Sequence, residues 1–257
     1  MYDPSSPLLR TAGTAGGPPA PDARARFAED RLLDAVIWCE MRPGETLTEA
    51  DVMERFGLTR AAARAGLTRL GYDGWAMPQP RAGWSVLPVT GALIGHVLGA
   101  RRIAEPALSE VRLSGDACSE LEQISVVLQA LDDRAEASAV SSLHHYLDRI
   151  DGLLLGALNP FTARHLRKLW HHSTRILRFL EGSSRNEVFK RCDVTALIAA
   201  VLSQDGDAIV KARMSLIDAE EEFCMRQLLR SDAPLTPGSG VLERAKTKSA
   251  ATNRRKT

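Results

Sequence analysis

Two arginines four residues apart, Arg60 and Arg64, form the pattern in this sequence that is best suited to binding chemistry. Side chains at this spacing lie on the same side of a helix, and guanidinium groups bind guanine edges and phosphate oxygens. The stretch 55–72 contains further arginines and no acidic residue, although the whole chain has a formal net charge of only +1. This local charge predicts a DNA-contacting surface, with a solvated amphipathic helix in a non-binding domain as the alternative.

Local signals around this pair predict a helix-turn-helix. Thr48 is suited to cap a helix that ends near Phe56, because threonine accepts a hydrogen bond from the first turn. Gly57 suits the turn that follows, because glycine accepts a positive φ. Thr59 is suited to cap the arginine-bearing helix, which we expect to end near Leu70.

Two short strands around a loop at 78–83 are expected to follow this helix as a wing. Gly83 at the tip would permit close approach of the backbone to DNA, and Arg81 would reach the minor groove or a phosphate. A winged helix-turn-helix places its second helix in the major groove. The predicted DNA-binding residues are Thr59, Arg60, Arg64, Arg81 and Gly83.

The remainder of the chain predicts an all-helical bundle, so the expected fold class is mainly α with a small β wing. Apolar residues recur there at helical spacing, without a strand pattern. The expected helices lie near 22–41 before the turn motif, and then near 90–113, 116–135, 138–158, 161–182, 186–203 and 206–230. The expected domains are a disordered N-terminal tail over 1–21, a winged helix-turn-helix over 22–89, a helical effector-binding and dimerisation domain over 90–231, and a disordered basic tail over 232–257.

Several classes of function find no support in the sequence. No apolar stretch approaches the length of about 18 residues that a membrane-spanning helix needs, and the start of the chain has no secretory-signal pattern. The motifs G-x-S-x-G and H-E-x-x-H and the P-loop are absent, so an enzyme built on the helical bundle is a remote alternative. We therefore expect a cytoplasmic, non-enzymatic protein that associates with the bacterial nucleoid when bound to DNA.

The segment PGETLTEADVMERFGLTRAAARAGLTRLGYDGWAMPQPRAGWSVLPV resembles the N-terminal domain of bacterial transcription regulators of the GntR family. Shared features are a PG pair before an acid-containing helix, a G-L-T-R turn, an arginine four residues later, L-x-x-x-G before the wing and R-x-G-x-x-V at its end. The resemblance covers about residues 27–90 and implies binding to double-stranded operator DNA. The family usually has proline and glutamate at the places of Ala62 and Ala65, so no operator sequence is implied.

The helical half resembles the FadR-type branch of that family, which carries an FCD domain. The resemblance rests on ARRIAEPAL and LNP, and it implies a helical bundle that binds a small effector and forms a homodimer. Many FCD domains bind a divalent metal through one Asp and three His. The places of the first two ligands fall at about Tyr146 and Ile150, and no histidine follows His172. We therefore expect no metal and no cofactor, with His144 and Asp148 as an alternative metal-binding pair.

Three residues are candidates for binding the effector. Arg101 matches an arginine that carries the ligand carboxylate in some relatives, with a surface or dimer salt bridge as its alternative role. Asp148 and Asp151, together with Asp193, would instead suit a hydroxylated or cationic ligand. The sequence leaves both options open, so a carboxylic acid is one candidate effector among others.

These patterns together predict a sequence-specific transcriptional regulator, acting as a repressor, whose operator affinity is modulated by a small-molecule effector. A homodimer would match a palindromic operator. The alternative is an effector-independent regulator with a degenerate ligand site, because the family's histidine set is missing. The operator, the regulated genes and the effector are not predicted.

Overall fold

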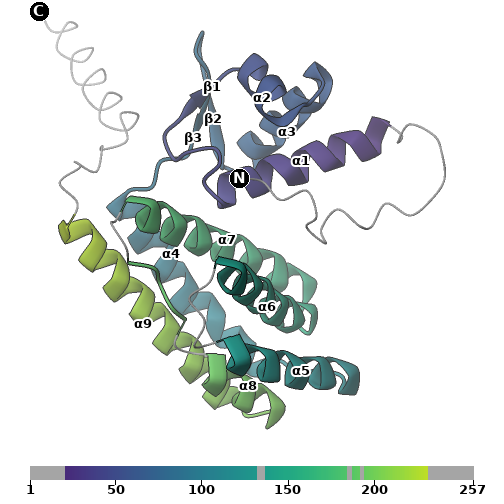
Figure 1. The fold of residues 1–257 in the computed structure, drawn as a ribbon, viewed down its shortest axis with the longest axis vertical. Helices are drawn as coiled ribbons and strands as arrows, with labels where there is room; N and C mark the ends of the chain where they lie inside the picture. The colour runs from purple at the N-terminus through teal and green to yellow at the C-terminus, as the bar shows by residue number, and fades with distance from the viewer. Residues whose placement is uncertain (1–20, 132–136, 184–186, 192–193, 231–257) are drawn as a thin grey trace, which may run out of the picture. The chain divides into compact units, whose positions relative to one another are not determined.

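The computed structural model describes residues 21–131, 137–183, 187–191 and 194–230. These residues form a mainly helical protein with a small three-stranded sheet, which confirms the expected fold class (Figure 1). The two predicted tails lie outside the described residues, apart from Pro21. No helix within the described ranges has both the length and the apolar character that crossing a membrane requires.

Contacts divide the chain into two units that do not follow the sequence order. The first contains the chain up to Asp34 and the segment Thr46–Val86, and the second contains Ala35–Glu45 and the chain from Leu87 onward. The sequence suggests one boundary near residue 89. The segment Ala35–Glu45 therefore groups with the helical unit, although it lies between elements of the winged unit in the sequence.

The winged unit combines helices with an antiparallel sheet of order β1-β3-β2. Its elements are α1 (Pro21–Ile37, the last residues of which belong to the second unit), β1 (Thr46–Leu47), α2 (Glu49–Phe56), α3 (Arg60–Tyr72), β2 (Ala76–Gln79) and β3 (Gly83–Val86). Ser85 of β3 pairs with Thr46 on one side and with Met77 on the other. The sequence did not predict β1, because two residues are too few to show an alternating pattern.

The predicted capping residues set the ends of α2 and α3. Thr48 caps α2 in a capping box with Asp51, and Gly57 ends it with a φ of 63°. The Thr59 hydroxyl accepts a hydrogen bond from the Ala62 N–H at 3.3 Å and so begins α3. On α3, Ala63, Leu67 and Leu70 are buried in the unit's core, which leaves the opposite face to solvent.

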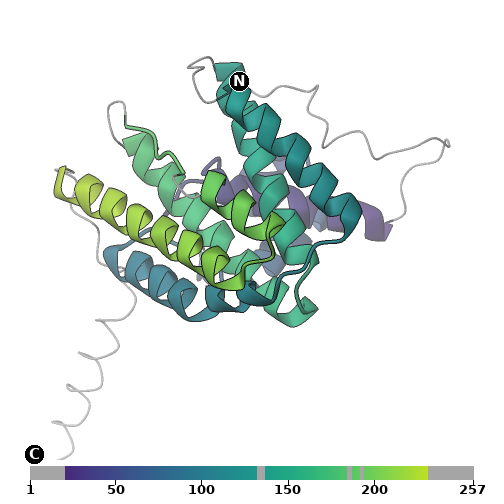
Figure 2. The same cartoon turned by 90° about the horizontal axis from the view of Figure 1, so that it is seen from below.

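The helical unit surrounds two clusters of buried apolar side chains. Its elements are α4 (Gly91–Ala104), the 3-10 helix η2 (Glu105–Glu110), α5 (Gly115–Leu131), α6 (Ala137–Gly156), α7 (Pro160–Ser183), α8 (Val194–Leu202) and α9 (Gly206–Arg230). Figures 1 and 2 show α9 beside α4 and α6 beside α7, and both pairs are in contact.

Two of the expected helices in this unit differ from the structure. The helix expected over 90–113 ends at Ala104, because Pro106 has no backbone N–H to continue the α-helical hydrogen bonding, and η2 follows. The helix expected over 186–203 begins only at Val194. Residues 187–191 have no regular secondary structure, and they contribute to the cavity described below.

Candidate DNA-binding surface and effector cavity

The first turn of α3 presents two of the predicted DNA-binding residues to solvent. Thr59 and Arg60 are both exposed, whereas Ala62 and Ala63 are buried and fix the helix against the core. The N-terminus of a helix favours anions, because its first N–H groups and its dipole point outward. An anion would therefore be stabilised at this end of α3, beside the exposed Arg60.

The second arginine of the pair, Arg64, is held by a residue that the sequence did not single out. Its Nε donates to Glu49 Oε1 at 2.8 Å and its Nη2 to Glu49 Oε2 at 3.1 Å, in a two-point ion pair. Arg64 keeps 66% of its side chain exposed. The hydrogen bond with Arg64 lowers the pKa of Glu49, and the nearby charge of Arg60 adds to that effect. Glu49 thus offsets part of the positive charge of this surface.

The wing is a hairpin in which Pro80, Arg81 and Ala82 connect β2 to β3. Arg81 is exposed in this connection, with a φ of 66°. Gly83 has a φ of 97°, and a Cβ added there would collide with the backbone carbonyl of Leu47. The structure therefore gives an internal reason for glycine at this position, distinct from the close approach to DNA that the sequence suggested.

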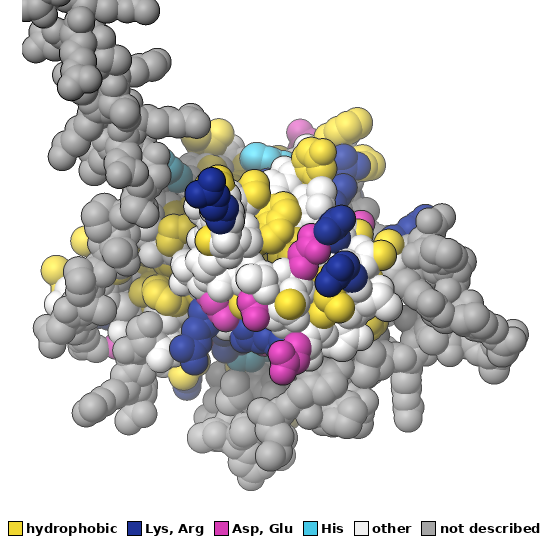
Figure 3. Space-filling model, turned by 90° about the horizontal axis from the view of Figure 1, so that it is seen from above, with side chains coloured by type: hydrophobic (Ala, Val, Ile, Leu, Met, Phe, Trp, Pro, Cys, Tyr) yellow, Lys and Arg dark blue, Asp and Glu magenta, His cyan; other side chains and the backbone are white. Residues whose placement is uncertain are grey.

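Basic side chains are divided among separate patches on one face of the described residues (Figure 3). Several of these patches in Figure 3 adjoin an acidic side chain. Such an arrangement suits a few positioned contacts better than broad attraction to a polyanion.

In the helical unit, Arg101 is buried rather than exposed, with 1% of its surface accessible. Its guanidinium binds the carboxylates of Glu105 and Glu220 and donates to the Ser173 hydroxyl at 2.8 Å. An effector carboxylate would have to displace one of these partners to bind Arg101. Of the two roles expected for this residue, the structure has an ion pair, located inside the unit rather than on its surface.

Glu105 is the centre of this buried network. It accepts hydrogen bonds from Arg101, from Arg213 Nε at 2.8 Å and from Trp170 Nε1 at 2.9 Å. Burial raises the pKa of Glu105, but the charges of Arg213 and Arg101 outweigh it, and the net shift is downward. Arg213 also lies over the Trp170 ring, 4.5 Å from its centroid.

The predicted effector residue Asp151 belongs to the same network. Its carboxylate accepts from Arg191 at 3.1 Å and from Arg213 at 3.3 Å. Sequence reasoning missed Glu105, Arg191, Arg213 and Glu220. The i,i+4 spacing of Arg101 and Glu105 was the available signal, whereas the other contacts join residues far apart in the sequence.

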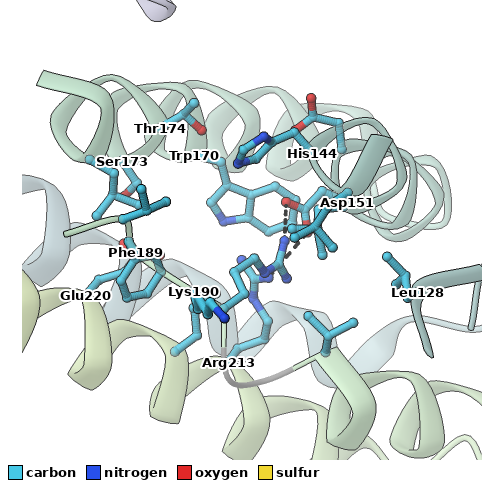
Figure 4. Close-up of a pocket in the computed structure, with 18 of the residues that line it drawn as sticks. Leu128, His144, Asp151, Trp170, Ser173, Thr174, Phe189, Lys190, Arg213 and Glu220 are labelled. Atoms are coloured by element: carbon cyan, nitrogen blue, oxygen red, sulfur yellow. Dashed lines mark hydrogen bonds and ion pairs between the residues drawn. The ribbon is translucent and has the colours of Figure 1, made fainter. Parts of the chain in front are cut away.

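A cavity of about 800 Å³ adjoins this network, and residues from α4 to α9 and from the segment 187–191 line it (Figure 4). The volume falls within the range of about 300–1,000 Å³ typical of small-molecule sites. Asp148 lines the cavity and is solvent-exposed, yet the walls partly desolvate its carboxyl group. This desolvation, together with the charge of Asp151, raises the pKa of Asp148 to about 6. Asp193 lies outside the described residues.

The segment that continues α1 also reaches this cavity. Trp38 lines it, with the Arg178 guanidinium 4.9 Å from its ring centroid and the His144 ring edge-on at 6.4 Å. The neighbouring Cys39 donates its S–H to the carbonyl of Arg175 on α7 at 3.5 Å. Trp38 and Cys39 thereby connect the residues that follow α1 with α6 and α7 of the helical unit.

The metal ligands of the FCD resemblance do not fit this chain. Ile150 is buried in the apolar core, and Tyr146 packs against the same cluster. Within the described part of the chain, no group of three or more His, Cys, Asp or Glu side chains is arranged to hold a metal ion. Burial lowers the pKa values of His171 and His172 to about 4, so both are neutral at pH 7.

Comparisons with known proteins agree with this architecture. Residues 24–86 match the family model described as bacterial regulatory proteins, gntR family, and no curated protein matches the chain in sequence. The structure of E. coli McbR/YncC is 18% identical, with a TM-score of 0.66 over 80% of this chain and 98% of that chain. A candidate GntR transcriptional regulator from Rhodococcus sp. RHA1 is 20% identical, with a TM-score of 0.55 over 78% and 97%. At these identities the two structures support a common fold.

Proposed function

We propose that this chain, whose residues 24–86 are a GntR-type DNA-binding domain, is a transcriptional regulator that reads its operator with α3 and the wing. The observation that carries the proposal is the exposed Arg60 at the capped start of α3, the helix that a winged helix-turn-helix places in the major groove.

Four of the five predicted DNA-binding residues take separate roles in this proposal. Arg60 reads a base edge, Arg64 contacts DNA in the orientation set by Glu49, and Arg81 contacts a phosphate or the minor groove. The Thr59 hydroxyl serves mainly as the helix cap. A homodimer would present two such surfaces to a palindromic operator.

The helical unit would act as an FCD-type effector domain. Its cavity has the size of a small-molecule site and is lined by both apolar and charged side chains. Effector binding would shift the balance between arrangements of the protein with high and low operator affinity, and Trp38 offers a route for that signal. Repression, relieved by the effector in the bacterial cytoplasm, is the mode of action that we propose.

A second candidate is an effector-independent regulator. It is favoured by the buried network, in which protein carboxylates already bind Arg101 and Arg213. A protein whose ligand site has become structural would show such internal pairing. A small molecule that raises the melting temperature in proportion to its occupancy, and that changes operator affinity, would rule this candidate out.

The DNA-binding proposal is tested with an operator selected from random duplexes by the purified protein. Arg60→Ala should weaken binding by about 1–3 kcal/mol, or roughly 5- to 150-fold, and relax the base preference at one position. Arg69→Ala is the matched control, because Arg69 lies on the same helix in an exposed ion pair with Asp73 at 2.9 Å. Its affinity should stay within about threefold of wild type. Equal affinities of wild type and Arg60→Ala would sink the assignment of Arg60.

A further inference from the structure

The arginines that line the cavity are already neutralised by carboxylates of the protein. Four arginines and four carboxylates take part, and each arginine has at least one partner. The pairs are Arg101 with Glu105 and Glu220, Arg213 with Glu105 and Asp151, Arg191 with Asp151, and Arg178 with Glu181. Replacing such a partner would leave a desolvated carboxylate without its counter-charge, which is costly. These arginines are therefore poor anchors for an incoming acid.

Two charged residues of the cavity wall remain outside these pairs. Lys190 and Asp148 both line the cavity, both are exposed, and neither makes a hydrogen bond or an ion pair within the described residues. They have opposite signs, so the cavity offers a ligand one available cation and one available carboxylate.

The two residues come from different walls. Asp148 lies on α6, four residues after His144 and three before Asp151, and all three residues line the cavity. Figure 4 shows Lys190 on the same side of the cavity as Arg213, with His144 on the other side. Because α6 and the segment 187–191 are separate elements of the wall, a ligand that meets both residues would present opposite charges at two positions.

Apolar side chains supply much of the remaining wall. Leu128, Leu143, Leu177, Phe189 and Ile198 line the cavity, and each comes from a different part of the unit. They suit a hydrocarbon body between the charged ends, since burying apolar surface is favourable by about 25 cal/mol per Å².

Building on the proposed effector role of this cavity, we propose that its ligand is a small zwitterion, with an ammonium group at Asp148, a carboxylate at Lys190 and an apolar body between them. Amine and carboxylate on one molecule would satisfy both available charges without breaking the arginine network. An ammonium beside Asp148 would also lower the pKa of that carboxyl group from about 6, so binding would release protons near that pH.

The test compares three probes that share one hydrocarbon chain: 6-aminohexanoate, hexylamine and hexanoate. Binding to the full-length protein is measured by calorimetry and by thermal shift at pH 7.5, with ω-amino acids of four to eight carbons to vary the charge separation. We expect the preferred ω-amino acid to bind at least about tenfold more tightly than either single-charge probe of its length, a difference of about 1.4 kcal/mol.

Two variants assign the contacts. Asp148→Asn should reduce the zwitterion's affinity to that of the carboxylate probe, and Lys190→Gln should reduce it to that of the amine probe. Glu122→Gln and Lys211→Gln are controls, because both residues are exposed and neither lines the cavity. Melting curves establish that each variant is folded.

Several results would contradict the proposal of a zwitterionic ligand. They are equal binding of hexanoate and the ω-amino acid, equal binding of hexylamine and the ω-amino acid, insensitivity to both variants, and no binding by any member of the series. Operator affinity of the wild type without ligand is measured in the same preparations. Intact operator binding with failure of the series rejects only the ligand class, whereas loss of sequence-specific operator binding rejects the proposed function.

Discussion

The carboxylate of Glu49 accepts two hydrogen bonds from the guanidinium of Arg64 and so links the first turn of α2 to the exposed face of α3. A two-point pair fixes the plane of the guanidinium, which reduces the freedom that Arg64 would lose on binding DNA. It also removes part of the charge that would attract phosphates. Glu49 is therefore expected to favour discrimination between sequences over affinity for any DNA.

Glu49→Gln should release Arg64 from this counter-charge. We expect tighter binding to a scrambled duplex, by about threefold or more, and a salt dependence of log K that is steeper by about 0.9, as for one further phosphate contact. Fluorescence anisotropy on operator and scrambled duplexes over a salt series measures both quantities. Asp73→Asn, which releases Arg69 from an exposed pair at the other end of α3, should change neither. An unchanged salt slope in Glu49→Gln would show that the pair does not limit phosphate contact.

The local part of this surface was predictable, and the Glu49–Arg64 pair was not. Thr48, Gly57 and Thr59 set the ends of helices through contacts within a few residues. The types of these residues therefore indicate the helix ends from the sequence alone. Glu49 and Arg64 are separated by 15 positions, and their contact depends on how α2 packs against α3. The sequence alone does not determine that packing.

Helix packing that the sequence does not determine also explains why the burial of Arg101 was not predicted. Its place on a helix was predictable, but its burial follows from the packing of α7 and α9, which supply Ser173 and Glu220. Arginine is rarely buried without partners, so a surface position was the default expectation. The end of α4 could have been predicted from the sequence, because Pro106 interrupts α-helical hydrogen bonding.

Gly83→Ala should destabilise the winged unit by more than backbone strain alone. Gly83 and Gly74 both have positive φ, at 97° and 78°, which costs a residue with a side chain about 1–2 kcal/mol. A Cβ at position 83 would also meet the Leu47 carbonyl, whereas a Cβ at position 74 would meet no atom within 4 Å. Urea unfolding should therefore show a larger loss for Gly83→Ala than for Gly74→Ala. Full stability of Gly83→Ala with weakened operator binding would instead assign this glycine to DNA contact.

Asp148 should make stability depend on pH in a defined direction. Its pKa is about 6 in the folded protein against an ordinary value of 3.8, so the fold favours the protonated carboxyl. As pH rises through this interval the unfolded chain ionises first, and the folded protein loses stability. A pKa difference of about two units would correspond to a loss of about 3 kcal/mol in the free energy of unfolding. Because Asp148 is exposed to solvent, we expect a loss of only about 1 kcal/mol.

Asp148→Asn should remove this loss, so its stability relative to wild type should increase between pH 4 and pH 7. Urea unfolding at intervals of one pH unit measures the difference, with Glu122→Gln on α5 as the exposed control. Parallel stability curves for wild type and Asp148→Asn would contradict the raised pKa of Asp148.

Arg213→Met should be the most destabilising of these changes, because Arg213 has two carboxylate partners and is 1% exposed. Methionine preserves much of the side-chain volume but leaves Glu105 with one cation fewer, and breaking a buried pair in this way costs about 3–5 kcal/mol. Arg226→Met on the same helix is the matched control. Its ion pairs with Glu222 and Glu187 are exposed or half-buried, so the expected loss is below about 1 kcal/mol. Adding Glu105→Gln to Arg213→Met should recover part of the loss, because the neutral amide no longer requires that counter-charge. Additive losses in the double variant would mean that Glu105 and Arg213 stabilise the unit independently.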